Sequence, residues 1–428
     1  MKKQAKFKET EIGMIPEDWE EFKLSETIEI NPKRELKKGV SAKKIPMDCL
    51  SPFNKKINDF EISKFSGGSK FVNGDTIMAR ITPCLENGKT SFVDILSDGE
   101  VGFGSTEFIV LSGKRGKTTN AFVYYLSISP QLRREAIKSM TGTSGRQRVQ
   151  NDLFEDIKVI IPPIPEQSAI AKILSSLDSK IELNQQMNKI LGAIGQTIFK
   201  RWFVDFEFPN EKGKQYKSSN GDMVDSELGK IPKGWKIKNV QDLLIFGKGI
   251  EPGSKYYQLE NCEGCIKFIR VGNISTSERE EVFIPIEKSG EKLCNEYDIL
   301  LSLDATIGVV KIGLKGAFSS GIRNVYSKEK ESIPKGYIYF LLKSDSVQEI
   351  IYTYAIGTTI LHAGASLDYI NITVPNQEIF QKFSKIIDPI FYKMISNVIE
   401  INKLEHIRNS LLPKLMSGKI RVPVEVRE

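Results

Sequence analysis

The stretch EQSAIAKILSSLDSKIELNQQMNKILGAIGQTIFKRWF, residues 166–203, decides the fold because it has the pattern of one long helix. Apolar residues recur in steps of three, four and seven, which is typical of a helix with a single apolar seam. The seam residues are Ile170, Leu174, Leu177, Ile181, Met187, Leu191, Ile194, Ile198 and Trp202. The segment contains no proline and would extend about 57 Å at 1.5 Å per residue.

A second segment near the carboxyl end repeats this pattern. Its apolar positions are Phe383, Ile387, Phe391, Met394, Val398, Ile401, Leu404, Ile407, Leu411 and Leu415. Both segments follow proline-containing stretches, 162–165 and Pro375, where a helix does not continue easily. Ordinary core helices or a homodimerising coiled coil would explain one seam, but two similar seams in one chain favour pairing with each other. Asn184 lies at an interior seam position, where a polar residue can fix the register of the pair.

The rest of the chain is also written twice. EIGMIPEDWEEF (residues 11–22) returns as ELGKIPKGWKIK (residues 227–238), with tryptophan at the same place. Further pairs follow in the same order: NGDTIMARI with EYDILLSLD, GFGSTEFIVL with AFSSGIRNVY, NAFVYYLSIS with KGYIYFLLKS, and TGTSGRQRVQNDLFEDIKVIIPP with IGTTILHAGASLDYINITVPN. This order predicts two copies of a strand-rich unit, each followed by a long helix. Copies related by a pseudo-twofold axis would place the two helices antiparallel, although the connection is long enough for a parallel pair.

Composition places the chain among folded proteins of two or three domains. It has 428 residues, of which 40% are hydrophobic and 27% charged, and its formal net charge is +7. This mildly basic balance is compatible with a nucleic-acid partner. Five cysteines without regular spacing argue against a disulfide framework and for a reducing compartment. The amino-terminal segment has no signal-peptide core, and no apolar run approaches the roughly 18 residues of a membrane helix, so we expect a cytoplasmic protein.

The sequence has few residues that could bind a metal. The two histidines, His362 and His406, are too few for a histidine-rich site. Cys262 and Cys265 form the one close cysteine pair, and Cys294 is the nearest other candidate. A structural zinc site would need two further ligands at matching spacing. The pair therefore belongs either to a plain surface loop or to part of a zinc site, and we expect no metal.

Motifs of catalysis are also missing. GKT tripeptides occur at residues 88–90 and 116–118, but neither has the glycine that a phosphate-binding loop needs five residues earlier. The sequence contains neither an adenine-methyltransferase tetrapeptide nor the G-x-S-x-G elbow of a hydrolase. We therefore expect a binding protein and not an enzyme.

Several segments resemble a known family. IPPIPEQSAIAKILSSLDSKIELNQQMNKIL, TIFKRWFVDF and LLPKLMSGKIRV are similar to the shared segments of type I restriction-modification DNA specificity subunits, as is the IPEDW opening. In that family a P-P-x-x-E-Q run opens the first long helix and an F-x-x-W-F-x-D-F run closes it. The matching residues here are Pro162, Pro163, Glu166, Gln167, Phe199, Trp202, Phe203, Asp205 and Phe206. The start of the second helix, VPNQEIFQKF, departs from the pattern because it lacks the second proline.

The resemblance implies an α+β fold with a pseudo-twofold internal repeat. Two strand-rich target recognition domains would be separated by two long antiparallel coiled-coil helices. The expected boundaries are 1–161 for the first domain, 162–204 for the first spacer helix, 205–223 for a linker, 224–376 for the second domain, 377–417 for the second spacer helix and 418–428 for a carboxy-terminal tail.

The resemblance also implies the function and the partners. Each domain would read one half of a bipartite site in double-stranded DNA, while the helices would set the spacing and dock two methyltransferase subunits. S-adenosylmethionine would be bound by those subunits, and ATP and magnesium by motor-nuclease subunits. The chain itself would then need no cofactor and no membrane.

The residues expected to contact DNA lie in polar, glycine-punctuated loops. Phosphates attract lysine, arginine and small hydroxyls, whereas base edges are read by arginine, amides and hydroxyls. The strongest candidate is the loop of residues 141–151, and its counterpart GTTILHAG offers Thr358, Thr359 and His362. The full set of expected DNA-binding residues is Arg80, Lys89, Thr141, Thr143, Ser144, Arg146, Gln147, Arg148, Lys248, Lys255, Arg270, Asn273, Arg323, Asn324, Thr358 and Thr359.

Two alternative functions fit parts of the sequence. The chain could be the recognition part of a methyltransferase or nuclease, although no remaining segment is long enough for a catalytic domain. It could also be a non-catalytic coiled-coil adaptor whose globular units bind protein or RNA. Binding of S-adenosylmethionine by the chain alone would support the first alternative. Absent or salt-insensitive duplex binding by the assembled complex would support the second.

Overall fold

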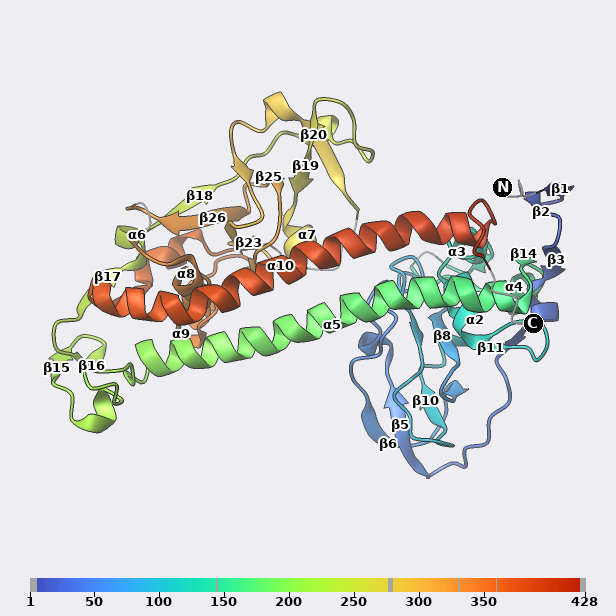
Figure 1. Cartoon of the computed structure of the whole chain (residues 1–428), viewed down its shortest axis with the longest axis horizontal. Coiled ribbons are helices and arrows are strands. Elements are labelled where there is room, and N and C mark those ends of the chain that lie inside the picture. Colours follow the sequence, from blue (N-terminus) through green and yellow to red (C-terminus); the bar gives the residue numbers. More distant parts are fainter. Residues whose placement is uncertain (1–5, 144, 276–279, 330–331, 359, 424–428) are drawn as a thin grey trace. The chain divides into compact units, whose positions relative to one another are not determined.

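The structure of the chain is a computed structural model. It describes residues 6–143, 145–275, 280–329, 332–358 and 360–423. The chain divides into two compact units: unit 1 comprises residues 1–182 and 403–428, and unit 2 comprises residues 183–402 (Figure 1). The two long helices, α5 (Ile164–Phe203) and α10 (Gln377–Met416), are uninterrupted, and each contributes one segment to each unit.

Unit 1 holds two four-stranded sheets and three short strand pairs. The first sheet, in the order β4-β11-β8-β9, consists of β4 (Ile28–Ile30), β11 (Phe108–Gly113), β8 (Thr76–Ala79) and β9 (Thr90–Phe92). The second, in the order β6-β5-β10-β7, consists of β6 (Glu61–Lys64), β5 (Ser41–Ile45), β10 (Gly102–Gly104) and β7 (Lys70–Phe71). The short pairs are β1 (Phe7–Thr10) with β2 (Gly13–Pro16), β3 (Glu20–Lys23) with β14 (Lys158–Ile161), and β12 (Met140–Thr141) with β13 (Arg148–Val149). The short helices are α1 (Leu24–Thr27), η1 (Met47–Cys49), α2 (Asn120–Ser127), α3 (Pro130–Lys138) and α4 (Asn151–Glu155).

Unit 2 repeats the two four-stranded sheets and the first two short pairs strand for strand, while its third short pair joins other positions than β12 with β13. Its first sheet, β18-β26-β22-β24, consists of β18 (Leu244–Lys248), β26 (Ile322–Ser327), β22 (Ile299–Ser302) and β24 (Val310–Lys311). Its second, β20-β19-β25-β21, consists of β20 (Val282–Pro285), β19 (Cys265–Ile269), β25 (Gly316–Phe318) and β21 (Leu293–Cys294). The short pairs are β15 (Met223–Ser226) with β16 (Gly229–Pro232), β17 (Lys236–Asn239) with β28 (Asn371–Val374), and β23 (Asp304–Ala305) with β27 (Leu361–His362). The short helices are α6 (Val240–Leu243), η2 (Lys217–Ser219), η3 (Ser254–Tyr256), α7 (Val271–Ser275), η4 (Ile286–Lys288), α8 (Lys335–Leu342), α9 (Asp345–Thr353) and η5 (Gly364–Tyr369).

The two units share details that confirm the predicted α+β repeat. The one parallel pair in each second sheet is the same pair, β5 with β10 and β19 with β25. The strands β8 and β22 lie inside the first sheets, and all four residues of each are buried. A strand that is buried on both faces is mostly apolar along its whole length, which explains why TIMA and ILLS could be recognised as strands from the sequence.

The helix segments run antiparallel within each unit. In unit 1, Asp178 of α5 forms a buried ion pair with Arg408 of α10, at 2.7 Å. In unit 2, the fully buried Asn184 donates a hydrogen bond to the Glu400 carboxylate at 2.9 Å. Asn184 therefore has a partner of the kind expected for a register-fixing residue.

The apolar seam of α5 deviates from the predicted one in unit 2. Ile194 was expected inside the seam, but its side chain is 43% exposed, and the buried position is Gly195. A Cβ built on Gly195 would lie 2.0 Å from Cζ of Phe340, so only glycine permits this close approach. A straight helix also drifts relative to a strict seven-residue repeat, which moves the buried face by about one position over this length.

Candidate nucleic-acid interface

The polar loop predicted from the sequence is a hairpin in unit 1. It runs from β12 to β13, and Arg148 in β13 also pairs with Ile81, just beyond β8. Gly142 opens the loop with a φ of +131°, and a Cβ there would lie 3.0 Å from the carbonyl oxygen of Arg146. The loop therefore needs glycine at this position, and it is anchored just beyond the end of the inner strand β8.

Arg148 is held by a carboxylate that the sequence did not single out. Glu107 accepts hydrogen bonds from its Nε at 2.9 Å and from its Nη2 at 2.7 Å. The hydrogen bond to Glu107 and its negative charge raise the pKa of Arg148, so the guanidinium stays charged. No local spacing links the two residues, because Glu107 precedes β11 and Arg148 lies in β13.

The other predicted residues of unit 1 differ in their availability. Arg80 donates from Nη2 to the carbonyl oxygen of Val149 at 2.6 Å, and Lys89 donates to that of Met47 at 2.9 Å. Their side chains therefore support the loops. The predicted residues that remain exposed or half-exposed on the hairpin are Thr141, Thr143, Arg146 and Gln147, while Ser144 lies outside the described residues.

Unit 2 has a hairpin at the matching place. It carries Thr358, which is exposed, and Thr359, which lies outside the described residues. His362, in β27, pairs with Asp304 in β23, and its Nδ1 lies 2.7 Å from Oδ1 of Asp304. Gly357 opens this hairpin with a φ of +123°, as Gly142 does in unit 1.

Arg323 and Asn324 lie in β26, between two other strands, and are only partly exposed. Arg323 donates from Nη1 to the carbonyl oxygens of Ser320 and Ile322, and burial lowers the pKa of its guanidinium. Asn324 donates to Asp298 at 3.4 Å. These contacts commit both side chains to holding the sheet.

The remaining predicted residues of unit 2 lie at the end of β18 (Lys248), in η3 (Lys255) and in or beside α7 (Arg270 and Asn273). Arg270 forms an ion pair with Glu280 at 3.4 Å, and the Asn273 side chain accepts from the Arg270 N–H at 2.9 Å. Lys248 and Lys255 are exposed, and the Lys255 ammonium lies 5.0 Å from the ring centroid of Tyr256. The hairpin and the α7 region therefore form separate groups of candidates.

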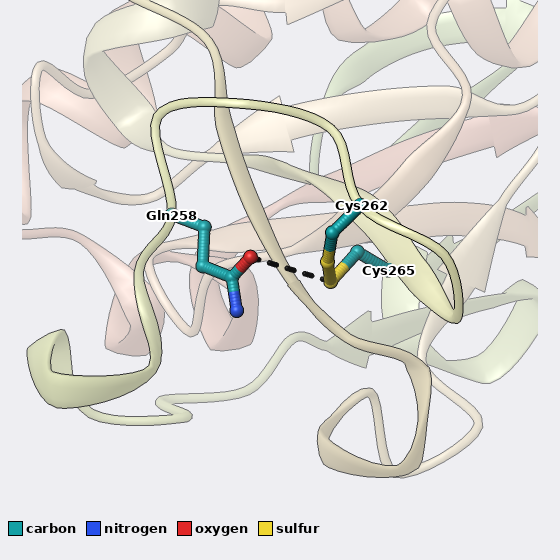
Figure 2. Close-up of a disulfide and its surroundings, with 3 residues drawn as sticks. All are labelled: Gln258, Cys262 and Cys265. Carbon is teal, nitrogen blue, oxygen red and sulfur yellow. Dashed lines mark hydrogen bonds between the residues drawn. A yellow bond between two sulfur atoms is a disulfide. The ribbon is translucent and has the colours of Figure 1, made fainter.

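The close cysteine pair is a disulfide, an outcome that neither sequence-based interpretation contained. Cys262 and Cys265 are joined, and the Cys265 sulfur lies 3.7 Å from Oε1 of Gln258 (Figure 2). Within the described ranges, Cys49, Cys84 and Cys294 are free thiols. In that same part of the chain, no three histidine, cysteine or acidic residues come together in a group that could hold a metal ion. No helix described there is long and apolar enough to cross a membrane.

The fold and these hairpins define a duplicated protein with one polar hairpin at the same point of each copy. The chain belongs to the family of the type I restriction modification DNA specificity domain, which matches residues 16–191 and 232–406. Both copies of the repeat are therefore copies of this domain.

Similar proteins cover nearly the whole chain. The MjaIX type I restriction enzyme specificity subunit of Methanocaldococcus jannaschii is 27% identical over 439 residues, covering 98% of this chain and 97% of that protein. The HindI specificity subunit of Haemophilus influenzae is 26% identical, covering 94% of this chain and all of that protein. The crystal structure of the S subunit of a type I restriction-modification system from M. genitalium aligns with a TM-score of 0.54 at 15% identity, covering 93% of this chain and 96% of that one. This last likeness supports the fold.

Proposed function

We propose that this chain is the DNA specificity subunit of a type I restriction-modification complex and that each unit reads one half of a bipartite DNA site. The observation that carries the proposal is the matched hairpin: the scaffold is the same in both units, but the polar side chains on it differ. A palindromic site needs only identical readers, whereas two different readers on one frame suit an asymmetric target. Family membership and the full-length likeness to specificity subunits support this role.

We further propose that α5 and α10 set the spacing between the two half-sites. Each helix has 40 residues without interruption, about 60 Å at 1.5 Å per residue. Buried polar contacts specify the register of the pair, since Asn188 donates to the carbonyl of Met394 at 3.1 Å and accepts from Asn397 at 2.8 Å. A slip of one turn would leave these groups unpaired in the core, which costs about 1–3 kcal/mol for each group.

A face of α5 supports the proposed docking of methyltransferase subunits. Leu183, Ile190 and Ile194 are 52%, 53% and 43% exposed, and their spacing of seven and four places them on one side of the helix. S-adenosylmethionine would enter with these partners, and ATP and magnesium with the motor-nuclease subunits. Replacing all three residues with serine should abolish co-purification with the methyltransferase subunit. Replacing Gln185 and Lys189, which are exposed on another side, should leave it intact.

The test of the reading role is methylation mapping in cells. The chain is co-expressed with its methyltransferase subunit, and methylated adenines are mapped across the genome with and without the chain. A split motif that disappears when the chain is omitted supports the proposal. Assembly of the complex without any such motif contradicts it, and salt-insensitive or absent duplex binding by that complex favours an adaptor for protein or RNA.

A further inference from the structure

We propose that Arg148 in unit 1 and His362 in unit 2 are equivalent base-reading residues, positioned by the carboxylates of Glu107 and Asp304, and that the difference between them helps to make the two half-sites different. The inference rests on the DNA-reading role proposed above. It adds the residues that distinguish one half-site from the other.

The two side chains occupy the same place on the repeated scaffold. Arg148 forms a β-bridge with Ile81, and His362 pairs with Asp304 in the same antiparallel sense. Each of these partners lies two residues beyond the end of the buried inner strand, β8 or β22. The equivalence of Arg148 and His362 therefore follows from backbone pairing. Sequence similarity does not reveal it, because the two residues differ in type.

The next residue along each strand confirms this register. The N–H of Val149 donates to the carbonyl of Arg80 at 2.9 Å, and the N–H of Ala363 donates to that of Leu303 at 2.7 Å. Arg80 and Leu303 are in turn the first residues after β8 and β22. The hairpins thus share their anchor points, and their outer side chains can be compared one by one.

The carboxylates come from different segments of the two units. Glu107 stands immediately before β11, and the residue at its place before β26 is Gly321: the N–H groups of Arg80 and Leu303 donate to the Glu107 and Gly321 carbonyls, both at 2.9 Å. The partner of His362 is instead Asp304, in β23. Simple duplication would have placed the carboxylate at the same position, so the carboxylate of unit 2 arose separately at a place where it contacts both His362 and, at 3.9 Å, Arg323.

The absence of a side chain at Gly321 leaves space for the Asp304 carboxylate in unit 2. A Cβ at this position would lie 3.2 Å from Cβ of Asp304 and 2.7 Å from a methyl carbon of Val271. A side chain like that of Glu107 could not be accommodated there together with Asp304. Unit 2 therefore has room for one carboxylate beside its reading residue.

The exposure of the two pairs follows the same order. The carboxylate side chains are 24% and 22% exposed for Glu107 and Asp304, whereas Arg148 is 43% and His362 is 63% exposed. In each pair the carboxylate is the more buried side chain, and the arginine or histidine extends from it to the surface. This arrangement orients a polar group towards an approaching ligand without presenting the negative charge to it.

Arg148 and His362 offer different hydrogen-bonding groups, which would recognise different bases. Glu107 accepts from Nε and Nη2 of Arg148, and the Arg146 carbonyl accepts from Nη1 at 3.4 Å. Nη1 and Nη2 each carry a second hydrogen, so the end of the fork still offers two donors to the O6 and N7 of guanine. A carboxylate only accepts hydrogen bonds, so Asp304 requires a proton on Nδ1 of His362. Nε2 is then the group that meets a base edge, and it has one hydrogen-bonding position where arginine has two.

The experiment uses the complex of the full chain with its methyltransferase subunits. Its motif is first mapped by methylation, and binding is then measured to duplexes carrying every single base change in the motif. Arg148→Ala should reduce discrimination at one base pair of one half-site by about 5- to 150-fold, as expected for the loss of one bidentate contact. His362→Ala should act on the other half-site alone.

The positioning carboxylate is tested by its effect on sequence preference. Glu107→Gln keeps the size of the side chain and removes its charge, and it should weaken discrimination at the same base pair as Arg148→Ala. Arg148→Lys should retain affinity but lose this discrimination, because lysine lacks the planar fork. A purely structural role would instead lower affinity equally for all duplexes.

Arg134, which is exposed on α3, provides the control, because Arg134→Ala removes a surface charge of unit 1 without touching the hairpin. It should leave every base preference unchanged. If the unmodified complex shows a motif and Arg148→Ala or Arg148→Lys reads it with unchanged discrimination, the inference is wrong while the specificity role stands. If the unmodified complex shows no split motif, the specificity role itself fails.

Discussion

Helices α5 and α10 pack around a buried ion pair in unit 1 and around aromatic rings in unit 2. In unit 1, Asp178 accepts hydrogen bonds from Arg408 and from the hydroxyl of Tyr125, both at 2.7 Å. The charged side chains are only 3% and 7% exposed. Burial and the neighbouring carboxylate raise the pKa of Tyr125, which keeps its hydroxyl a donor.

All three positions of this polar triad are apolar in unit 2. The two helices have the same length, so counting from their first residues places Phe391 where unit 1 has the aspartate and Gly195 where it has the arginine. The matching residue for the tyrosine is Phe340, at the same place on α8 as the tyrosine on α2. Phe340 contacts Gly195, and both phenylalanines are fully buried.

The ends of the helices show the same contrast. In unit 1, Glu166 accepts from Nε1 of Trp19 at 2.9 Å and from Arg421, whose guanidinium lies 5.7 Å from the indole centroid. In unit 2, Phe208 stacks on Trp235 with ring centroids 5.1 Å apart. The tryptophan is common to both units, but a cation covers it in one and an aromatic ring in the other.

At these positions the repeated scaffold constrains shape and not polarity, whereas Asn184 and Asn397, which match by the same count along the helices, are both polar and buried. A buried ion pair can be exchanged for apolar residues of similar volume with little change in stability, but only if both charges change together. Removing one charge leaves the other unpaired in the core. Changes at such contacting sites are strongly non-additive, which explains why the triad differs at all three positions.

The largest effect is expected from breaking the unit 1 triad at one position. Asp178→Ala should lower the free energy of unfolding of unit 1 by about 3–5 kcal/mol, because it strands the Arg408 guanidinium. Hydrogen exchange measured by mass spectrometry would assign the loss to unit 1 peptides. The triple variant Tyr125→Phe, Asp178→Phe and Arg408→Gly reproduces the unit 2 residues and should recover most of the loss. A triple variant as unstable as the single one would contradict the proposed equivalence.

The next effect concerns the close approach in unit 2. Gly195→Ala should destabilise unit 2 by about 1–3 kcal/mol, since the new methyl would meet the Phe340 ring at 2.0 Å. Gly192→Ala on the same helix is the matched control: its Cβ would meet only Cε of Met394, at 3.7 Å. That variant should gain up to about 1 kcal/mol from helix propensity. Equal thermal midpoints for the two variants would show that Gly195 is not a packing requirement.

A smaller effect is expected when only the hydroxyl of the triad is removed. Tyr125→Phe keeps the ring and removes one of the two donors to the Asp178 carboxylate, so unit 1 should lose about 0.5–1.5 kcal/mol. Denaturant unfolding followed by unit 1 hydrogen exchange would measure it. In the background of the Asp178→Phe and Arg408→Gly changes the same substitution should cost nothing, and a persisting cost would mean that the hydroxyl has another role.

The repeat and the two helices could be predicted because they depend on local patterns. Periodicity predicted a helix over residues 166–203 and a second one through the apolar positions from Phe383 to Leu415, and the structure has helices at Ile164–Phe203 and Gln377–Met416. The exposed side chain of Ile194 was missed because the position of the seam there depends on a ring from α8, which no helical period encodes.

The hairpin of unit 1 could also be located from its glycines and its polar residues. The ion pair between Arg148 of this hairpin and Glu107 could not be predicted, because the two residues lie in distant segments of the chain. Arg323 was singled out for its residue type, but its strand lies between two others and burial commits its guanidinium to backbone carbonyls. Residue type alone does not distinguish an arginine on an exposed hairpin from one whose side chain is bound within the sheet.

The smallest expected effect is a dependence on pH that comes from the carboxyl of Asp18 in unit 1. Burial acts to raise the pKa of the Asp18 carboxyl, but its hydrogen bonds and the charge of Arg421 more than offset this, so the pKa lies below its usual 3.8. A lowered pKa stabilises the folded state above the usual value, and this contribution is lost as the pH falls below 3.8 through the folded-state pKa. Unit 2 has Gly234 and Phe208 at the matching places, and neither titrates. The protection of the peptides around Trp19 against hydrogen exchange, corrected for the slower intrinsic exchange at lower pH, should therefore fall between pH 4 and pH 3 more than it does in the Asp18→Asn variant. If the fall is as large in that variant, the titrating group is another carboxyl.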